Sequence, residues 1–176
     1  MLDANVLFGR TLRDVLLYAA AEGLYQARWS TETLDEVRRN LVQQGKLTTT
    51  AATRLLALLQ DAFDEAEVVD YERYLEQVEN HPKDRHVSAA ALQAGAAIIV
   101  TKNLSDFVPA PHGVVVESPD AFLNRLLNMS QTRVLKVIRI LEATYGQPRL
   151  TVEDLLMTLN GDAPHFVTRV RTLLGM

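Results

Sequence analysis

Four carboxylates stand in separate segments of the chain, where a fold of alternating strands and helices would bring them to one end of a sheet. They are Asp3, Glu36, Asp84 and Asp106. Because carboxylates repel one another, several of them in one cleft need a cation to offset the repulsion. Hard oxygen ligands favour Mg²⁺ or Mn²⁺, and Mg²⁺ held by carboxylates most often handles phosphates. These residues therefore favour metal-dependent phosphodiester chemistry.

Asp3 is the strongest of the four from the sequence alone. It lies in the apolar run 2–7, where an acid costs several kcal/mol unless it is paired or bound to a metal. The alternative is an aspartate at a frayed chain end. Asn5 is interpreted as a neighbour that orients Asp3, or as a turn residue.

The other three acids have structural alternatives that the sequence leaves open. Asp106 lies in a loop after an apolar run, where an aspartate often only stabilises a turn or caps a helix. Asp84 is equally suited to cap the helix that follows it. Glu36 lies on the face opposite the apolar stripe of its helix, at 100° per residue. Periodicity therefore cannot choose among Glu32, Asp35 and Glu36.

Other ionisable side chains lie near these acids. His81 and His86 flank Asp84, but without a second histidine pair at metal-ligand spacing they are interpreted as polar loop and helix residues. The basic residues near the expected rim of the cleft are suited to phosphate contacts or to an exposed surface; they are Arg38, Arg39, Lys83, Arg85 and Lys102.

Length and composition indicate an ordinary globular protein. The 176 residues suffice for one domain, or for one domain with an appendage, and 48% of them are hydrophobic. No apolar run approaches the roughly 18–20 residues of a membrane span. The absence of cysteine excludes disulfides, cysteine-ligated zinc and thiol nucleophiles, and it favours a cytoplasmic protein.

The N-terminal sequence carries two further expectations. No basic segment precedes an apolar one there, so no signal peptide is expected. The first expected strand begins almost at residue 1, which is abrupt for a central strand. Either that strand is clipped, or the natural chain starts further upstream.

Charge is distributed unevenly along the chain, whose net charge is −4. Residues 1–127 carry 12 basic and 18 acidic residues, a net charge of −6, whereas residues 128–176 carry 6 and 4, a net charge of +2. The acidic first part argues against tight, non-specific binding to long duplexes.

Strand and helix patterns alternate up to about residue 127, which predicts an α/β fold with a parallel sheet. The expected strands are 2–7, 24–29, 66–69, 96–101 and 114–117. Helices are expected around 12–23, from Ser30 or Thr31 to 45, over 48–65, over 85–95 and from Ser118 onward. Ligand sites in such folds lie beyond the carboxyl ends of the strands.

From about residue 129 the pattern changes to helices only, joined by turns at 146–148 and 160–162. A pairing of Thr151 with Asp154 predicts a capped helix over 151–159, and Asp162 is expected to start the last helix. We expect a small helical appendage over 128–176, too small to fold alone. Its basic residues are expected to face outward on the same side as the acidic cleft, where they would contact the phosphate backbone of a substrate; they are Arg133, Lys136, Arg139, Arg169 and Arg171.

The order of these segments resembles the PIN-domain nucleases over roughly residues 1–127. Segment 2–7 is similar to the first-strand motif, 34–37 to the second-helix motif and 83–87 to the third acid at its helix start. Segment 100–107 is similar to the motif that follows the fourth strand. The resemblance selects Glu36 where periodicity could not. Many relatives carry an acid at Asn103 and an Asp at His81, so metal occupancy is expected to be weaker here.

The resemblance implies a ribonuclease that cuts RNA with Mg²⁺ or Mn²⁺. Asp3, Glu36, Asp84 and Asp106 would hold the metal and act in catalysis, supported by the polar residues Asn5, Thr101 and Asn103. Many small bacterial members are VapC-like toxins, commonly dimeric, and held inactive by a cognate antitoxin protein. The resemblance thus implies an RNA substrate, an antitoxin partner and a homodimer, with no membrane.

Two other functions fit parts of the sequence. A haloacid-dehalogenase-like phosphatase also starts with an aspartate after the first strand, but it needs a second aspartate where Asn5 stands. A PIN scaffold that binds RNA or protein without turnover is the remaining alternative, because Asn103 lacks charge. Nuclease assays with and without EDTA separate this alternative from the nuclease.

Overall fold

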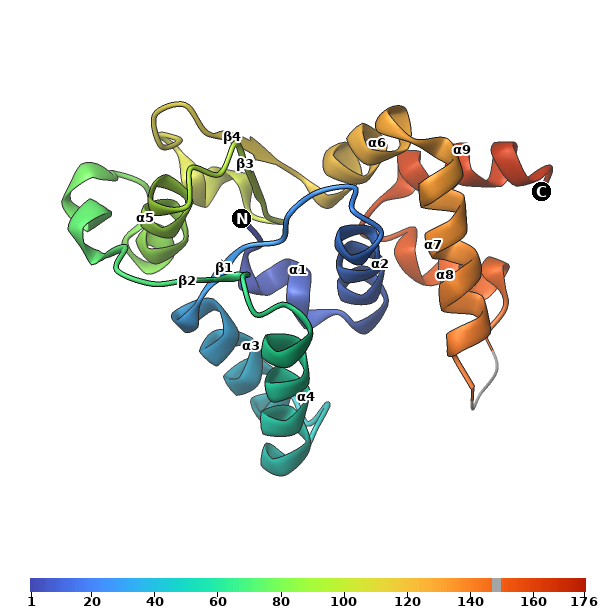
Figure 1. The fold of residues 1–176 in the computed structure, drawn as a ribbon, viewed down its shortest axis with the longest axis horizontal. Helices are drawn as coiled ribbons and strands as arrows, with labels where there is room; N and C mark the ends of the chain where they lie inside the picture. Colours follow the sequence, from blue (N-terminus) through green and yellow to red (C-terminus); the bar gives the residue numbers. More distant parts are fainter. Residues whose placement is uncertain (147–149) are drawn as a thin grey trace. The chain divides into compact units, whose positions relative to one another are not determined.

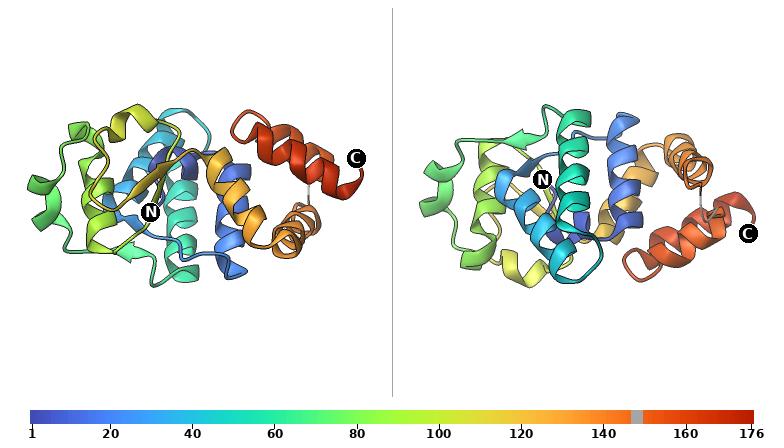
Figure 2. Two further views of the ribbon diagram at one scale, coloured as in Figure 1. Left: turned by 90° about the horizontal axis from the view of Figure 1, so that it is seen from above. Right: turned by 90° about the horizontal axis from the view of Figure 1, so that it is seen from below.

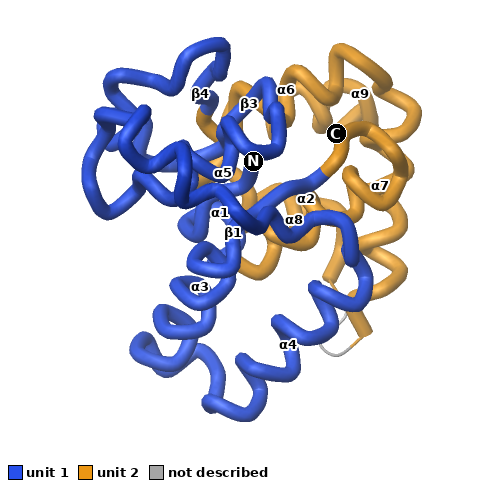
Figure 3. The backbone as a smooth tube through the Cα atoms, turned by 60° about the vertical axis from the view of Figure 1, so that its left-hand side comes forward, with its two compact units in different colours: residues 1–8, 27–117 blue, residues 9–26, 118–176 orange. Residues whose placement is uncertain are grey.

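The computed structural model describes residues 1–146 and 150–176, so the expected turn at 146–148 lies largely outside the described residues. Its described residues form two compact units, and each is described below by itself (Figures 1 and 3). Unit 1 consists of residues 1–8 and 27–117, and unit 2 of residues 9–26 and 118–176.

Unit 1 contains short parallel strands. β1 (Trp29–Ser30) pairs with β2 (Glu67–Val68), and β3 (Ile98–Val100) pairs with β4 (Val115–Glu117). Residues 1–3 lie between the two pairs, because the backbone N–H of Leu2 bonds to the carbonyl before β1, and Leu2 forms a parallel bridge with β3. The predicted α/β class is confirmed.

The predicted strand over 2–7 is wrong beyond its first residues. Only residues 1–3 are extended, and α1 (Ala4–Phe8) begins directly after Asp3. α1 buries Ala4, Val6 and Leu7. A short apolar run does not distinguish a strand from a buried helical turn, since both bury most of their side chains.

The helices of unit 1 begin at residues that the sequence marks. Ser30 caps α3 (Thr31–Gln43) and Thr48 caps α4 (Thr49–Ala62), each accepting a bond from a backbone N–H of the first turn. α3 and α4 lie side by side, as the light-blue and teal helices of Figure 2 show. α5 (Arg85–Gln93) follows two 3-10 helices, η1 (Glu72–Gln77) and η2 (Pro82–Asp84).

The core of unit 1 joins α5 to the strands. Val87 and the alanines of α5 are fully buried together with Ile99 of β3 and Phe107 of a third 3-10 helix, η3 (Leu104–Phe107). Small alanine side chains let α5 pack closely on its neighbours. This packing fixes the start of α5 and the end of β3, where Asp84 and Asp106 lie.

Unit 2 contains only helices among its described residues: α2 (Arg10–Ala21), α6 (Pro119–Met129), α7 (Gln131–Thr144), α8 (Val152–Leu159) and α9 (Pro164–Leu174). Ser118 caps α6, and the expected capping box of Thr151 and Asp154 begins α8. α2 contacts α7 and α8, so the compact unit includes a helix from early in the sequence.

The expected start of the last helix at Asp162 is wrong, because α9 begins at Pro164 after Ala163. Alanine has no side-chain acceptor for a cap. Instead, Asp120 of α6 accepts a bond from the backbone N–H of Phe166 at 2.9 Å, and its other oxygen lies 2.7 Å from His165 Nδ1. The cap of α9 thus comes from another helix.

The five basic residues of 128–176 that were expected to face outward are less free than expected. Lys136 pairs with Glu22 at 2.7 Å and Arg139 with Glu142 at 3.2 Å, although both basic side chains are exposed. Arg169 is half-buried and donates to Asn124 and Asn128 of α6. The two remaining ones also have partners: Arg133 donates to Gly23 O, and Arg171 pairs with Glu153.

Within the described residues no helix is long and apolar enough to cross a membrane. The domain boundary between residues 127 and 128 stays a prediction, and the compact units group residues 9–26 and 118–127 with the helices that follow.

Candidate active site

Asp3 lies at the junction between the extended residues 1–3 and α1, and it is almost fully buried. Its Oδ1 accepts a bond from the N–H of Ala4 at 2.6 Å. Its Oδ2 accepts bonds from Asn5 Nδ2 and from the Thr101 hydroxyl, both at 2.6 Å. A carboxylate has about four lone-pair positions, so these three bonds leave one position on Oδ1 for a further ligand.

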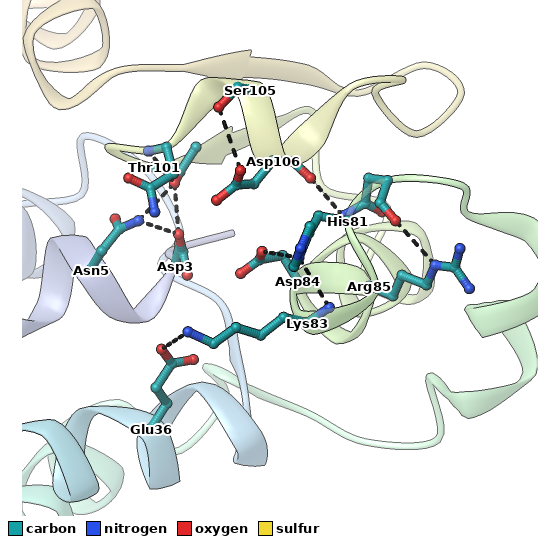
Figure 4. Close-up of polar contacts among 12 residues, drawn as sticks. Asp3, Asn5, Glu36, His81, Lys83, Asp84, Arg85, Thr101, Ser105 and Asp106 are labelled. Atoms are coloured by element: carbon teal, nitrogen blue, oxygen red, sulfur yellow. Dashed lines mark hydrogen bonds and ion pairs between the residues drawn. The ribbon is translucent and has the colours of Figure 1, made fainter.

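Asn5 and Thr101 hold one another as well as Asp3. Asn5 Nδ2 also donates to Thr101 Oγ1 at 3.0 Å, and Asn5 Oδ1 accepts from the N–H of Lys102 at 3.0 Å. Thr101 Oγ1 in turn accepts from the N–H of Asn103. The predicted supporting residues therefore form one network (Figure 4), to which Asn103 contributes its backbone.

The charge of Asp3 is costly where it lies. Burial raises its pKa to about 6; the bond from Thr101 opposes this rise, and the negative charges of Asp84 and Glu36 add to it. Asp3, Asp84 and Glu36 thus interact electrostatically, although they come from three distant parts of the sequence.

Asp84 ends η2 and directly precedes α5. Its side chain makes no capping bond to α5, which argues against the structural alternative for this residue. Its Oδ2 lies 3.5 Å from His81 Nδ1. Burial raises the pKa of Asp84, and the nearby charge of Asp106 raises it further.

Asp106 lies in η3, just beyond the carboxyl end of β3. Its side chain accepts only a long bond, 3.4 Å, from Ser105 Oγ. Its backbone carbonyl accepts bonds from the N–H of His81 and from Asn80 Nδ2. Asn80 is buried, and its own carbonyl accepts from Arg85 Nε, so Asn80 links η3 to the start of α5. The sequence analysis missed this positioning role.

Glu36 projects from α3 and lies 3.5 Å from Lys83 Nζ. Its side chain is 16% exposed, whereas those of Glu32 and Asp35 on the same helix are 58% and 54% exposed. Of the three acids that periodicity could not separate, Glu36 is thus the most enclosed. This difference supports its choice as the site residue.

Figure 4 shows the carboxylates of Asp3, Asp84 and Asp106 directed toward a common space, with Glu36 on its other side joined to Lys83. In the described part of the chain, however, no three acidic or histidine side chains are close enough together to hold a metal ion. The acids share one region without forming a closed cage.

These residues fit a Mg²⁺ or Mn²⁺ ion in their chemistry. All four donors are carboxylates, and Asp3 keeps an open lone pair. Burial, and to a smaller extent the charges of neighbouring acids, raise the pKa values of Asp3 and Asp84, and a cation would relieve both effects. Mg²⁺ usually keeps several waters and is bound through one or two carboxylates. An open arrangement therefore suits this ion, and Lys83 supplies a positive charge beside Glu36.

His86 has a role that the sequence analysis did not find. Its Nδ1 lies 3.0 Å from Ser30 Oγ, and Ser30 caps α3. Glu32 is 3.7 Å from the same ring nitrogen and accepts a bond from Tyr71. Burial lowers the pKa of His86, so the neutral ring is favoured. His86 thus fixes α5 against the start of α3, the helix that carries Glu36.

Comparisons with known proteins match two segments of this chain to family models. The family model described as PIN domain matches residues 1–105, and the model described as VapC50 C-terminal domain matches residues 119–172. The chain is 34% identical over 106 residues to a Mycobacterium tuberculosis (strain ATCC 25618 / H37Rv) protein named "Putative ribonuclease VapC50".

That match covers 58% of this chain and 63% of the relative, so it spans less than two thirds of the relative's length. No solved structure gave a significant match. The PIN domain model covers more than half of the chain, and it includes Asp3, Glu36 and Asp84. This chain therefore belongs to the PIN domain family.

Proposed function

We propose that this protein is a metal-dependent endoribonuclease and the toxin of a toxin–antitoxin pair. The observation that carries the proposal is that the carboxylates of Asp3, Asp84 and Asp106 are directed toward a common space (Figure 4), and that Asp3 and Asp84 lie within the segment matched by the family model. The name of the relative, a ribonuclease, supports RNA as the substrate.

In this proposal the four carboxylates have two roles: they hold the cation, and one of them accepts a proton from the attacking water. Asp3 binds through its open lone pair on Oδ1, while Asn5 and Thr101 keep its other oxygen fixed. A bound Mg²⁺ or Mn²⁺ supplies positive charge for the phosphate oxygens and positions a water. Asp84 and Asp106 have oxygens with few partners, and one of these carboxylates assists removal of the proton from the attacking water.

Glu36 changes partners in this scheme. In the metal-free chain it is paired with Lys83, whose charge offsets part of the repulsion among the acids. A cation held by Glu36 would replace Lys83 as its counter-charge, and the Lys83 ammonium would then be available to the RNA backbone. The further parts of the proposal are an RNA substrate, a cognate antitoxin protein, a homodimer and a cytoplasmic location.

The experiment compares the wild type with Asp3→Asn. We expect the variant to lose Mg²⁺- or Mn²⁺-dependent RNA cleavage by about 100-fold or more, the effect of losing a positioned catalytic group. Asp35→Asn is the matched control, because Asp35 is an exposed acid of α3 that pairs with Arg38. EDTA should abolish wild-type cleavage.

Undiminished cleavage by Asp3→Asn, or full wild-type cleavage in EDTA, would contradict the proposal. RNA binding without cleavage at any Mg²⁺ or Mn²⁺ concentration would instead favour the binding module, which the open spacing of the acids makes the second candidate.

A further inference from the structure

Unit 1 has a pocket of about 590 Å³ beside the candidate active site. Its volume lies within the roughly 300–1,000 Å³ of sites for small molecules. Glu36 and Lys83 line this pocket and also belong to the candidate active site, so the two regions are continuous. A ligand that spans both would place one part in the pocket and the next part at the acids.

One wall of the pocket is a stripe of α3. Glu32, Glu36 and Arg39 lie at positions i, i+4 and i+7 of this helix and line the pocket together. The opposite face of α3 buries its apolar residues in unit 1. α3 therefore has an apolar face that packs in the core and a polar face that lines the pocket.

Two cationic groups of the pocket are available to an anionic ligand. Arg39 is exposed and makes no hydrogen bond or ion pair with any other described residue. Arg85 uses Nε to bond Asn80 O at 3.1 Å, which leaves its two terminal nitrogens for a ligand. Guanidinium groups bind phosphate through paired donors.

The pocket also has carboxylates and an apolar surface. Glu36 is paired with Lys83 and Glu32 with Tyr71, but Glu76 is exposed and has no partner among the described residues. Leu75 and Pro82 supply the apolar surface, next to the His86 ring. A pocket for phosphate alone would need neither a carboxylate nor an apolar surface.

We propose that this pocket is a subsite for one unstacked nucleotide of single-stranded RNA, next to the phosphate that is cut. Arg39 and Arg85 contact its phosphate, and Leu75 and Pro82 contact the base. Glu76 accepts a hydrogen bond from the amino group of the base. The subsite rests on the proposed ribonuclease function and adds the part of the substrate that the acids do not contact.

The carboxylate gives the subsite a preference among bases. A carboxylate only accepts hydrogen bonds; adenine, cytosine and guanine each offer it an exocyclic amino group at the base edge, whereas uracil offers only its ring N3–H. The pocket also excludes a continuous duplex, because a base enters it only when it is unstacked from its neighbours.

The test measures binding of labelled 12-nucleotide oligo(A), oligo(C) and oligo(U) to the full chain in EDTA, where cleavage is silent. Arg39→Gln should weaken binding several-fold and reduce the slope of log K against log salt by about 0.7, the value for one contact to a single strand. Arg38→Gln is the matched control, since Arg38 is the adjacent residue of α3 and pairs with Asp35 at 3.2 Å. Wild type should bind oligo(A) and oligo(C) more tightly than oligo(U), and Glu76→Gln should reduce that difference.

Equal binding by Arg39→Gln and Arg38→Gln, or equal binding of the three oligonucleotides by the wild type, would overturn the subsite. The proposed nuclease fails separately: wild type that binds as described here but never cleaves RNA with Mg²⁺ or Mn²⁺ keeps the subsite and loses the nuclease. Wild type that cleaves RNA while Arg39→Gln matches its control keeps the nuclease and loses the subsite.

Discussion

At the scale of single residues, Asp3 combines burial with a charge that the fold stabilises only in part. Three hydrogen bonds favour its ionised form, yet burial and two neighbouring acids raise its pKa to about 6. Such a group is unfavourable in a protein that only needs to fold. It suits a site that binds a cation, because the positive charge stabilises the buried carboxylate.

The raised pKa of Asp3 predicts how stability depends on pH without metal. An aspartate has an ordinary pKa of 3.8 and Asp3 one of about 6 in the folded chain, so the folded state holds the proton longer. The contribution of Asp3 to the free energy of unfolding is therefore fully present below about pH 4, and it is lost as the pH rises to about 6. We expect urea unfolding in EDTA to show a loss of about 3 kcal/mol over this range that is absent in Asp3→Asn.

The absolute stability of Asp3→Asn will differ from that of the wild type for reasons unrelated to titration, so the test compares how the stability of each protein changes with pH. Asparagine has one acceptor oxygen, so it cannot accept the bonds from both Ala4 and Thr101 in the same way, and its absolute stability will shift. The difference in slope between pH 4 and pH 6 is insensitive to that shift. Parallel pH profiles for wild type and Asp3→Asn would show that the pKa of Asp3 is ordinary.

The individual site residues were predictable from the sequence to different degrees. An acid in an apolar run is a signal within the sequence itself, so Asp3 could be proposed directly as a site residue. Glu36 required the family resemblance, because its pairing with Lys83 of η2 joins parts of the chain that are far apart in sequence. The pocket beside it could not be predicted, since it joins α3, η1, η2 and α5.

At the scale of elements, the predicted helix starts were right where the capping residue is adjacent in sequence. Ser30, Ser118 and Thr151 each accept the expected backbone bond. The strands were less predictable: they are two or three residues long, and their pairing depends on partners far along the chain. The start of α9 was wrong because its cap comes from α6.

The cap from Asp120 to α9 predicts a loss of stability on mutation. Asp120→Ala should lower the free energy of unfolding by about 1–2 kcal/mol, the usual effect of removing a helix cap from a mostly enclosed position. Asp120→Asn keeps an acceptor oxygen for the N–H of Phe166 and should recover part of this loss. Urea unfolding at neutral pH measures both.

Equal stability of Asp120→Ala and wild type would mean that water serves the first turn of α9 as well as Asp120 does. A loss of the same size in Asp120→Asn would instead assign the effect to the pairing with His165.

At the scale of the whole molecule, the chain does not divide at one point. α2 lies early in the sequence but belongs to the same compact unit as α6–α9. Its Leu12 and Leu16 are fully buried, and Tyr145 of that unit donates to Asp14 at 2.6 Å. The sequence could not predict this grouping, because an amphipathic helix does not specify which partner covers its apolar face.

This grouping predicts the result of cutting the chain at the expected boundary. A chain of residues 1–127 keeps α2 but lacks α7 and α8, which contact it. Each large apolar side chain that becomes exposed costs about 1.5–3 kcal/mol, so exposing even two of the buried apolar side chains of α2 would cost a large fraction of the stability of a typical domain. We expect the truncated chain to melt at a much lower temperature than the full chain, or to aggregate.

Co-expression of residues 128–176 as a separate chain is the control, because it restores α7 and α8 without the covalent link. Recovery of a cooperative melt in the mixture would assign the defect to the missing cover on α2, including the pair of Glu22 with Lys136 at 2.7 Å. A truncated chain that melts cooperatively at the wild-type temperature would show that α2 needs no partner from residues 128–176. In that case the boundary at residue 127 would separate a self-sufficient PIN domain from its appendage.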